Sequence, residues 1–190
     1  MWSHADLVFR ARTWLTNTRK CAVVLSEVGS WNLSEIPDAI GWTPKGHSIL
    51  IECKASRADF LRDTEKQSRQ DDYFKALGAF RYYFVPAIER TGLPVIRPED
   101  ELPEGWGVLV VGAKNRVTVA VDATHMDMAV EERGHPLVRG RRDAEIILLV
   151  AELRRHIDGW RRDGSGAGGA GAGGEGAVGA GDEDRSRLTG

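Results

Sequence analysis

Apolar residues recur along most of the chain in short periodic segments separated by polar turns, a pattern typical of mixed α/β proteins. Ser3, with Asp6 three residues later, forms a capping pair, and the apolar positions that follow have helical spacing. A first helix is therefore expected from Ser3 to about Asn17. Three short strands are then expected in a meander: Cys21–Leu25, Ile36–Trp42 and His47–Cys53.

The alternation of helix and strand continues after this meander. A second helix should begin near Ser56 and extend toward Leu77, as one helix or as two. The β-prone run Phe80–Val85 predicts a fourth strand, and two more strands are expected around a turn at 112–116. A long amphipathic helix should then cover one face of the sheet, with an apolar side made of Ile146, Leu149, Val150, Leu153 and Ile157.

The composition changes sharply after residue 162. The segment 163–190 consists largely of Gly/Ala repeats and holds half of the 22 glycines in the chain. Because it can bury too little apolar surface to offset its ordering entropy, it is expected to be a disordered, low-complexity tail. The residues 1–162 are predicted to form one α/β domain, with a mixed central sheet flanked by helices.

Charge and cysteine content exclude some classes of protein without selecting one. The net charge of the chain is −2. The segment 163–190 contributes −3, so residues 1–162 carry +1 and are nearly neutral. Cys21 and Cys53 lie far apart, and the five histidines lack metal-binding spacing, so neither a disulfide framework nor a zinc site is expected. No segment resembles a signal peptide or a membrane span, so a cytoplasmic location without a membrane partner is expected.

Two acids and a lysine fall at the ends of neighbouring predicted strands. Asp38 follows Pro37, and a later apolar run ends in Glu52-Cys53-Lys54. Side chains two residues apart in a strand share a face, so Glu52 and Lys54 should point the same way. Cys53 should then point into the core, which leaves its backbone carbonyl as a further candidate ligand. Carboxylates suit hard cations such as Mg²⁺, and a lysine beside the metal can position water or neutralise charge on a phosphate.

The same residues also allow a purely structural interpretation. Glu52 and Lys54 can form an ion pair at a strand end, and Asp38 can be a turn residue. The catalytic interpretation is favoured by the spacing of the two acids, by the apolar strand before each and by the helix that follows. Glu27, at the edge of the first predicted strand, adds a third acid to the same group.

Ile36-Pro37-Asp38, followed by Ile51-Glu52-Cys53-Lys54, resembles the signature of the PD-(D/E)xK phosphodiesterase superfamily, which has the restriction-endonuclease-like fold. The expected order of elements from Ser3 to Val85 also resembles the αβββαβ core of that superfamily, over a little under half of the chain. Three further segments resemble bacterial and phage members of a DNA-repair-type branch: 54–63, 81–86 and 105–107.

This resemblance implies metal-dependent hydrolysis of phosphodiester bonds in nucleic acid, with DNA as the expected partner and Mg²⁺ or Mn²⁺ as the cofactor. Asp38 and Glu52 would hold the metal, and Lys54 would orient the attacking water or stabilise the transition-state phosphate. Glu27 matches the position of an additional acid, and Glu35 competes for that role. The alternative is a nucleic-acid or protein binding module that has this fold without the catalysis.

The second predicted helix carries basic residues that could contact nucleic acid. Arg57, Lys66 and Arg69 are candidate phosphate contacts, which would add affinity without sequence preference. The alternative is a solvent-facing helix surface with pairs of opposite charge one turn apart. The sequence carries no dimerisation signature, so it neither indicates nor excludes a homodimer.

Overall fold

The computed structural model describes residues 2–29, 36–67, 77–125 and 138–164. The chain forms two compact units, Met1–Arg154 and Arg155–Gly190, and the sheet described below belongs to the first. Most of the expected disordered tail, 165–190, lies outside the described residues. No helix in the described ranges is both long enough and apolar enough to cross a membrane.

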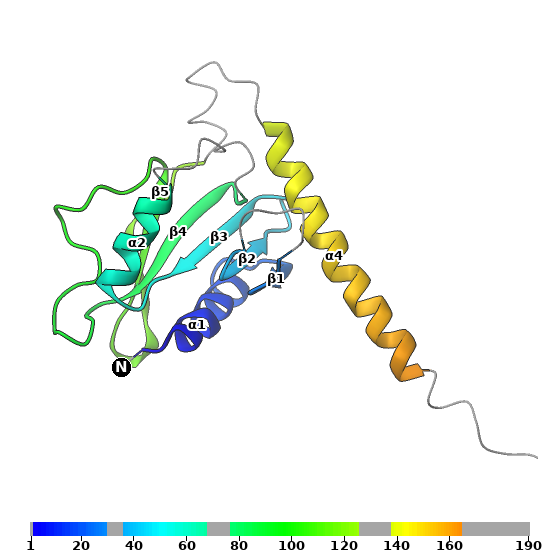
Figure 1. Cartoon of the computed structure of the whole chain (residues 1–190), viewed down its shortest axis with the longest axis horizontal. Coiled ribbons are helices and arrows are strands. Elements are labelled where there is room, and N and C mark those ends of the chain that lie inside the picture. The colour runs from blue at the N-terminus through cyan, green and yellow to red at the C-terminus, as the bar shows by residue number, and fades with distance from the viewer. Residues whose placement is uncertain (1, 30–35, 68–76, 126–137, 165–190) are drawn as a thin grey trace, which may run out of the picture. The chain divides into compact units, whose positions relative to one another are not determined.

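One six-stranded mixed sheet is the centre of the first unit (Figure 1). Its strands lie side by side in chain order, with β2 antiparallel to both β1 and β3. β4 and β5 run parallel to β3, and β6 returns antiparallel along β5. The strands are β1 (Val23–Leu25), β2 (Ala39–Trp42), β3 (Ser48–Cys53), β4 (Phe80–Pro86), β5 (Trp106–Val111) and β6 (Val117–Val121).

The strand predictions are confirmed in number and order, with shifts at some ends. β1 begins at Val23 rather than Cys21, and β2 begins at Ala39 rather than Ile36. The second shift has a simple cause, because Pro37 has no N–H to give to a strand ladder. Asp38 is consequently the residue immediately before β2, at the end of the sheet.

Helix α1 (His4–Asn17) covers one face of the sheet. The expected capping pair is present, since Ser3 Oγ accepts from the N–H of Asp6 and the Asp6 carboxylate accepts from the N–H of Ser3. The helix buries a stripe at helical spacing against alternate residues of the strands, among them Ile49, Ile51 and Cys53. Its buried residues are Leu7, Val8, Ala11, Trp14 and Leu15.

The opposite face of the sheet is covered by α2 (Arg57–Gln67) and by the first part of α4 (Val138–Gly164). Phe60 of α2 packs edge-on against Tyr83, with ring centroids 5.1 Å apart. From α4, Ala144 and Leu148 enter this second core. Glu145 beside them is buried too and accepts hydrogen bonds from Trp42 Nε1, Ser48 Oγ and the Gly78 N–H.

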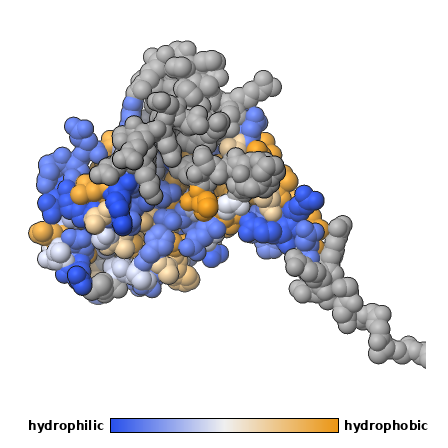
Figure 2. Space-filling model, in the orientation of Figure 1, coloured by the Kyte–Doolittle hydropathy of each residue, from blue (hydrophilic) through white to orange (hydrophobic). Residues whose placement is uncertain are grey.

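The prediction of which side of α4 faces the sheet is wrong. Ile146, Val150 and Leu153 are 56–60% exposed, and orange atoms are visible along α4 in Figure 2. The residues that pack are Ala144, Glu145 and Leu148, on a different side of the helix. Hydrophobic periodicity found the helix, but the three hydrogen bonds to Glu145 set its rotation, because an unpaired buried carboxylate is costly.

Candidate active site

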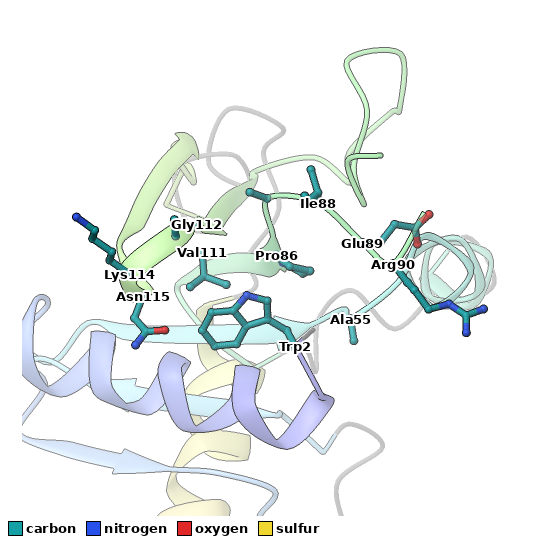
Figure 3. A pocket seen from close by; sticks show the side chains of 12 residues that line it. Trp2, Ala55, Pro86, Ile88, Glu89, Arg90, Val111, Gly112, Lys114 and Asn115 are labelled. Carbon is teal, nitrogen blue, oxygen red and sulfur yellow. The ribbon is translucent and has the colours of Figure 1, made fainter. Parts of the chain in front are cut away.

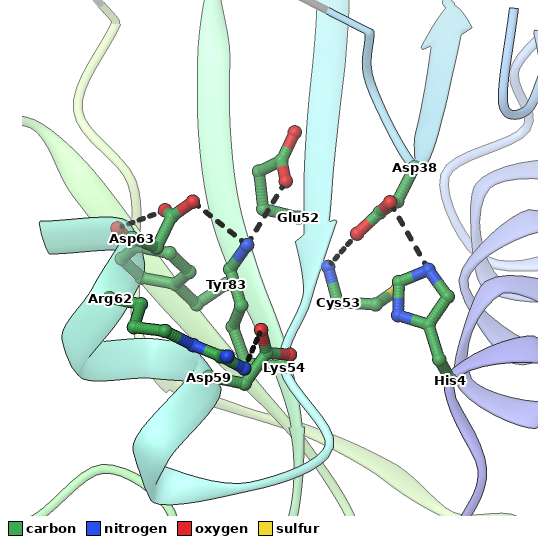
Figure 4. Close-up of polar contacts among 9 residues, drawn as sticks. All are labelled: His4, Asp38, Glu52, Cys53, Lys54, Asp59, Arg62, Asp63 and Tyr83. Atoms are coloured by element: carbon green, nitrogen blue, oxygen red, sulfur yellow. Dashed lines mark hydrogen bonds and ion pairs between the residues drawn. The ribbon is translucent and has the colours of Figure 1, made fainter. Parts of the chain in front are cut away.

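The residues predicted to form a site gather where β3 ends. In the β2–β3 register Ala39 lies opposite Ile51, so Asp38 lies next to Glu52 across the ladder. On the other side of β3, Glu52 pairs with Tyr83 of β4. Asp38, just before β2, and Glu52, near the end of β3, therefore lie beside each other at one end of the sheet (Figure 4).

Lys54 is held between two carboxylates. Its Nζ lies 3.3 Å from Glu52 Oε2 and 3.0 Å from Asp63 Oδ1, and the residue is only 7% exposed. Burial by itself would lower the pKa of this lysine, but the charges of Glu52 and Asp63 outweigh it and raise the pKa above its usual value. The predicted common face of Glu52 and Lys54 is thus confirmed, and Lys54 is an ammonium at neutral pH.

Asp38 has different partners. Its Oδ2 accepts the backbone N–H of Cys53 at 2.7 Å, and its Oδ1 lies 3.3 Å from Nε2 of His4 on α1. Burial raises the pKa of Asp38, even though the Cys53 N–H, His4 and Lys54 all act to lower it. The Asp38 carboxylate is therefore less stable in its charged form than an ordinary aspartate, unlike the ammonium of Lys54.

Cys53 lies between these groups and confirms a further prediction. Its side chain is 1% exposed and packs in the core beneath α1, as the alternation along β3 requires. Burial raises the pKa of its thiol well above the usual value, and the negative charges of Asp38, Glu52 and Glu27 add to that rise. All three predicted acids thus lie within electrostatic reach of one thiol.

Glu27 lies at the same edge of the sheet but is exposed. Its N–H donates to the carbonyls of Pro37 and Asp38, at 3.1 and 3.3 Å, and its φ of +52° is in the left-handed region. This loop holds the backbone of Glu27 beside that of Asp38. Its competitor Glu35 lies outside the described residues.

The donor chemistry at this edge fits a hard divalent cation in part. Asp38 and Glu52 supply carboxylate oxygens, which Mg²⁺ prefers, and such ions are often held by one or two carboxylates with water and phosphate completing the shell. Among the residues whose side chains the structure describes, no group of three or more His, Cys, Asp or Glu is arranged to hold a metal ion. The described residues thus offer a pair of acids rather than a complete protein cage.

Three polar side chains in this cluster are not identified by sequence motif: His4, Asp63 and Tyr83. Asp63 accepts from Lys54 at 3.0 Å and from Tyr83 Oη at 3.1 Å. A weak signal for Asp63 exists, because it follows buried Phe60 by three residues and so shares its helix face. For His4 no signal exists, since its position depends on how α1 packs on the sheet.

The predicted phosphate contacts on α2 have a mixed outcome. Arg57 forms two hydrogen bonds with Asp100, at 2.6 and 2.7 Å, and a third with the carbonyl of Val95. Its guanidinium thus ties the loop before β5 to the start of α2, and we do not assign it to nucleic acid. Lys66 lies in α2 but its side chain is outside the described part of the chain, and Arg69 lies outside the described residues.

Comparison with known proteins adds evidence on the fold but none on the chemistry. No family model matches the chain. No curated protein matches it either. Among solved structures, the chain is similar to the SPO1766 protein of unknown function from Silicibacter pomeroyi, with a TM-score of 0.54 and 23% identity. The likeness covers 88% of this chain and 97% of the other, and at this identity it shows a shared α/β fold alone.

Proposed function

We propose that the chain is a metal-dependent nuclease with a restriction-endonuclease-like core, which hydrolyses phosphodiester bonds in nucleic acid, with DNA as the expected substrate. The observation that carries the proposal is the meeting of Asp38, Glu52 and Lys54 at one edge of the sheet. The element order α1, β1, β2, β3, α2, β4 supports the proposed core. Repair, recombination or phage and host DNA processing would use such an activity.

The state of Lys54 limits its role in this reaction. Because its pKa is raised, it stays protonated at neutral pH and cannot act as a general base. It can donate hydrogen bonds, to a phosphate oxygen that gains charge or to the oxygen of an attacking water. Tyr83 Oη and Lys54 Nζ both bond Asp63, which therefore orients the lysine.

Asp38 and Glu52 would hold Mg²⁺ or Mn²⁺, with the backbone carbonyl of Cys53 as a further ligand and Glu27 as an additional acid. A bound metal would supply Lewis-acid stabilisation of the phosphate and a more acidic water. Asp38 is suited to this role, since a nearby cation would stabilise a carboxylate that burial leaves less stable in its charged form.

A second candidate function is a binding module with the same fold and no catalysis. The observation in its favour is that both oxygens of Asp38 and the ammonium of Lys54 already have protein partners. In such a module these contacts would be structural, and the edge of the sheet would bind its partner without cleaving it.

Cleavage assays separate the two functions. Labelled single-stranded, duplex and branched DNA and RNA are incubated with Mg²⁺, Mn²⁺ or EDTA. Asp38→Asn, Glu52→Gln and Lys54→Met are each expected to lower the cleavage rate by at least about 100-fold, and EDTA should abolish cleavage. Matched controls are Asp143→Asn, an exposed acid on α4, and Lys45→Met, an exposed lysine in the β2–β3 turn.

Both controls should retain wild-type rates. Cleavage that continues in EDTA, or in all three site variants, would refute the mechanism. Binding without cleavage under every condition would instead support the binding module. Circular dichroism of each variant shows whether a lost rate reflects a lost fold.

A further inference from the structure

A pocket of about 610 Å³ opens beside the candidate active site, and none of the contacts described above uses it. It lies where the parallel strands β4 and β5 end, at Pro86 and Val111, and the N-terminal Trp2 forms another of its walls (Figure 3). Its volume is within the usual range for small-molecule and cofactor sites.

Two connections join this pocket to the site. Ala55, which follows Lys54 directly, is part of its lining. On the other side, Trp2 precedes by two residues the His4 whose imidazole contacts Asp38. A nucleic-acid strand that passes over Asp38 and Lys54 would therefore reach the pocket next to the N-terminal end of α1.

The lining combines an aromatic surface with cations and an amide. The Trp2 indole lies in the middle of the view in Figure 3, with Lys114 and Arg90 toward opposite ends. Neither cation forms an ion pair with another side chain in the described ranges. Asn115 adds an amide that can both donate and accept hydrogen bonds.

Glu89 is the one acid in the lining. Its Oε2 accepts the N–H of Arg57 at 3.0 Å, and its Oε1 accepts from Thr91 Oγ1 at 2.7 Å. These bonds direct both carboxylate oxygens to protein partners. The pocket thus offers two uncommitted cations for phosphate, an indole for stacking and an amide for a base edge.

The geometry points to this pocket as the site of an unpaired nucleotide next to the scissile phosphate, with its base on Trp2 and its phosphates near Arg90 and Lys114. This inference rests on the proposed function, because it takes nucleic acid as the ligand. It narrows the substrate class to strands in which a base is already unpaired, since extrusion from a duplex has its own cost. Single strands, bulges and damaged or mispaired positions belong to that class.

The test measures binding in EDTA, where cleavage plays no part. The probes are two labelled DNA hairpins that carry one unpaired adenosine or an abasic residue at the same position. Wild-type protein should bind the adenosine probe roughly 5- to 150-fold more tightly, the usual effect of one stacked base. Trp2→Ala should lose this difference, and Trp2→Phe should keep most of it.

Phe9→Ala is the matched control, because Phe9 is an exposed aromatic on α1, the helix that follows Trp2, and lies outside this pocket. It should leave the preference unchanged. Arg90→Ala and Lys114→Ala should weaken both probes alike and each lower the salt slope by about one unit. Lys45→Ala, in a turn outside the pocket, should do neither.

The inference is overturned if wild-type protein binds both probes equally, or if Trp2→Ala weakens the two probes by the same factor. It also falls if the protein binds no nucleic acid at all, in which case the proposed function falls with it. A preference for the adenosine probe without cleavage in Mg²⁺ would retain the pocket and remove the nuclease activity. Cleavage in Mg²⁺ without such a preference would retain the nuclease activity and remove the pocket as a nucleotide site.

Discussion

Replacing Lys54 with methionine tests the electrostatics of the site through the stability of the fold. The change keeps an unbranched side chain of similar length in the core but removes the ammonium. Glu52 and Asp63, whose side chains are 12% and 17% exposed, would then share one space without a cation. Removing one partner of a buried ion pair costs about 3–5 kcal/mol, because the other charge is left uncompensated.

Partial exposure reduces that cost, since water reaches both carboxylates, and Tyr83 Oη still donates to Asp63. We therefore expect Lys54→Met to lower the free energy of unfolding at pH 7 by about 2–4 kcal/mol. The companion variant Lys54→Met/Asp63→Asn removes one of the two repelling charges. It should be more stable than the single variant, which a double-mutant cycle makes visible.

Urea denaturation measures these differences, provided that the slope of free energy against urea is unchanged among the variants. The melting temperature of Lys54→Met should fall by about 4–16 °C. The pH dependence has a definite sign, because the folded pKa of Lys54 is raised. Its contribution is complete below about pH 10 and disappears as the pH rises through the folded pKa, so wild type and Lys54→Met should converge in strong alkali.

Lys45→Met is the control for the loss of a lysine charge, and it should change stability by less than about 0.5 kcal/mol. A Lys54→Met protein as stable as wild type at pH 7 would refute the reasoning. It would mean that Glu52 and Asp63 do not depend on the ammonium for compensation.

Three further predictions follow from particular contacts. Gly78→Ala should lower the unfolding free energy by about 2–4 kcal/mol in urea denaturation, because Gly78 has φ +86° and an added Cβ would lie 2.5 Å from Leu50 Cβ. Gly46→Ala is the control and should cost less, because an added Cβ there meets open space. Burial, and then the bond to Asp122, raises the pKa of Tyr82 to about 12. Tyr82 should therefore contribute to a fall in stability as the pH rises from about 10 through 12, and Tyr82→Phe should make that slope shallower and remove the matching phenolate absorbance step. Asp38→Asn should lower cleavage by at least about 100-fold and yet raise the unfolding free energy by about 0.5–2 kcal/mol at pH 7, above the raised pKa of Asp38, and this gain should disappear as the pH falls to the ordinary range of an aspartate.

The strands and the first two helices could be predicted because their signals are local. The capping pair Ser3/Asp6 starts α1, and the alternation of buried and outward residues along β3 gives Glu52 and Lys54 a common face. The same alternation predicts that the Cys53 side chain points into the core, where it is buried. Each of these predictions needed only residues within a few positions of one another.

What could not be predicted depends on contacts between distant segments. Glu145 is buried because donors from three other parts of the chain meet its carboxylate, and this sets the rotation of α4 against its own hydrophobic stripe. His4 reaches Asp38 only because α1 packs with its N-terminus at the edge of the sheet. Asp63 of α2 contacts Lys54 only because that helix packs beside the end of β3, where Lys54 also contacts Glu52. Periodicity within one element contains none of this information.

The two interpretations of the site make different demands on Asp38. An ion pair of structural origin accounts for Lys54, Glu52 and Asp63, since their opposite charges outweigh the cost of burial. It does not account for Asp38, whose charged form burial destabilises despite the nearby cation. A residue selected for stability alone would be served better by asparagine, which keeps an acceptor for the Cys53 N–H without the charge. The proposal of catalysis therefore depends most on Asp38, and the two effects of Asp38→Asn, on cleavage and on stability, must be measured in the same protein.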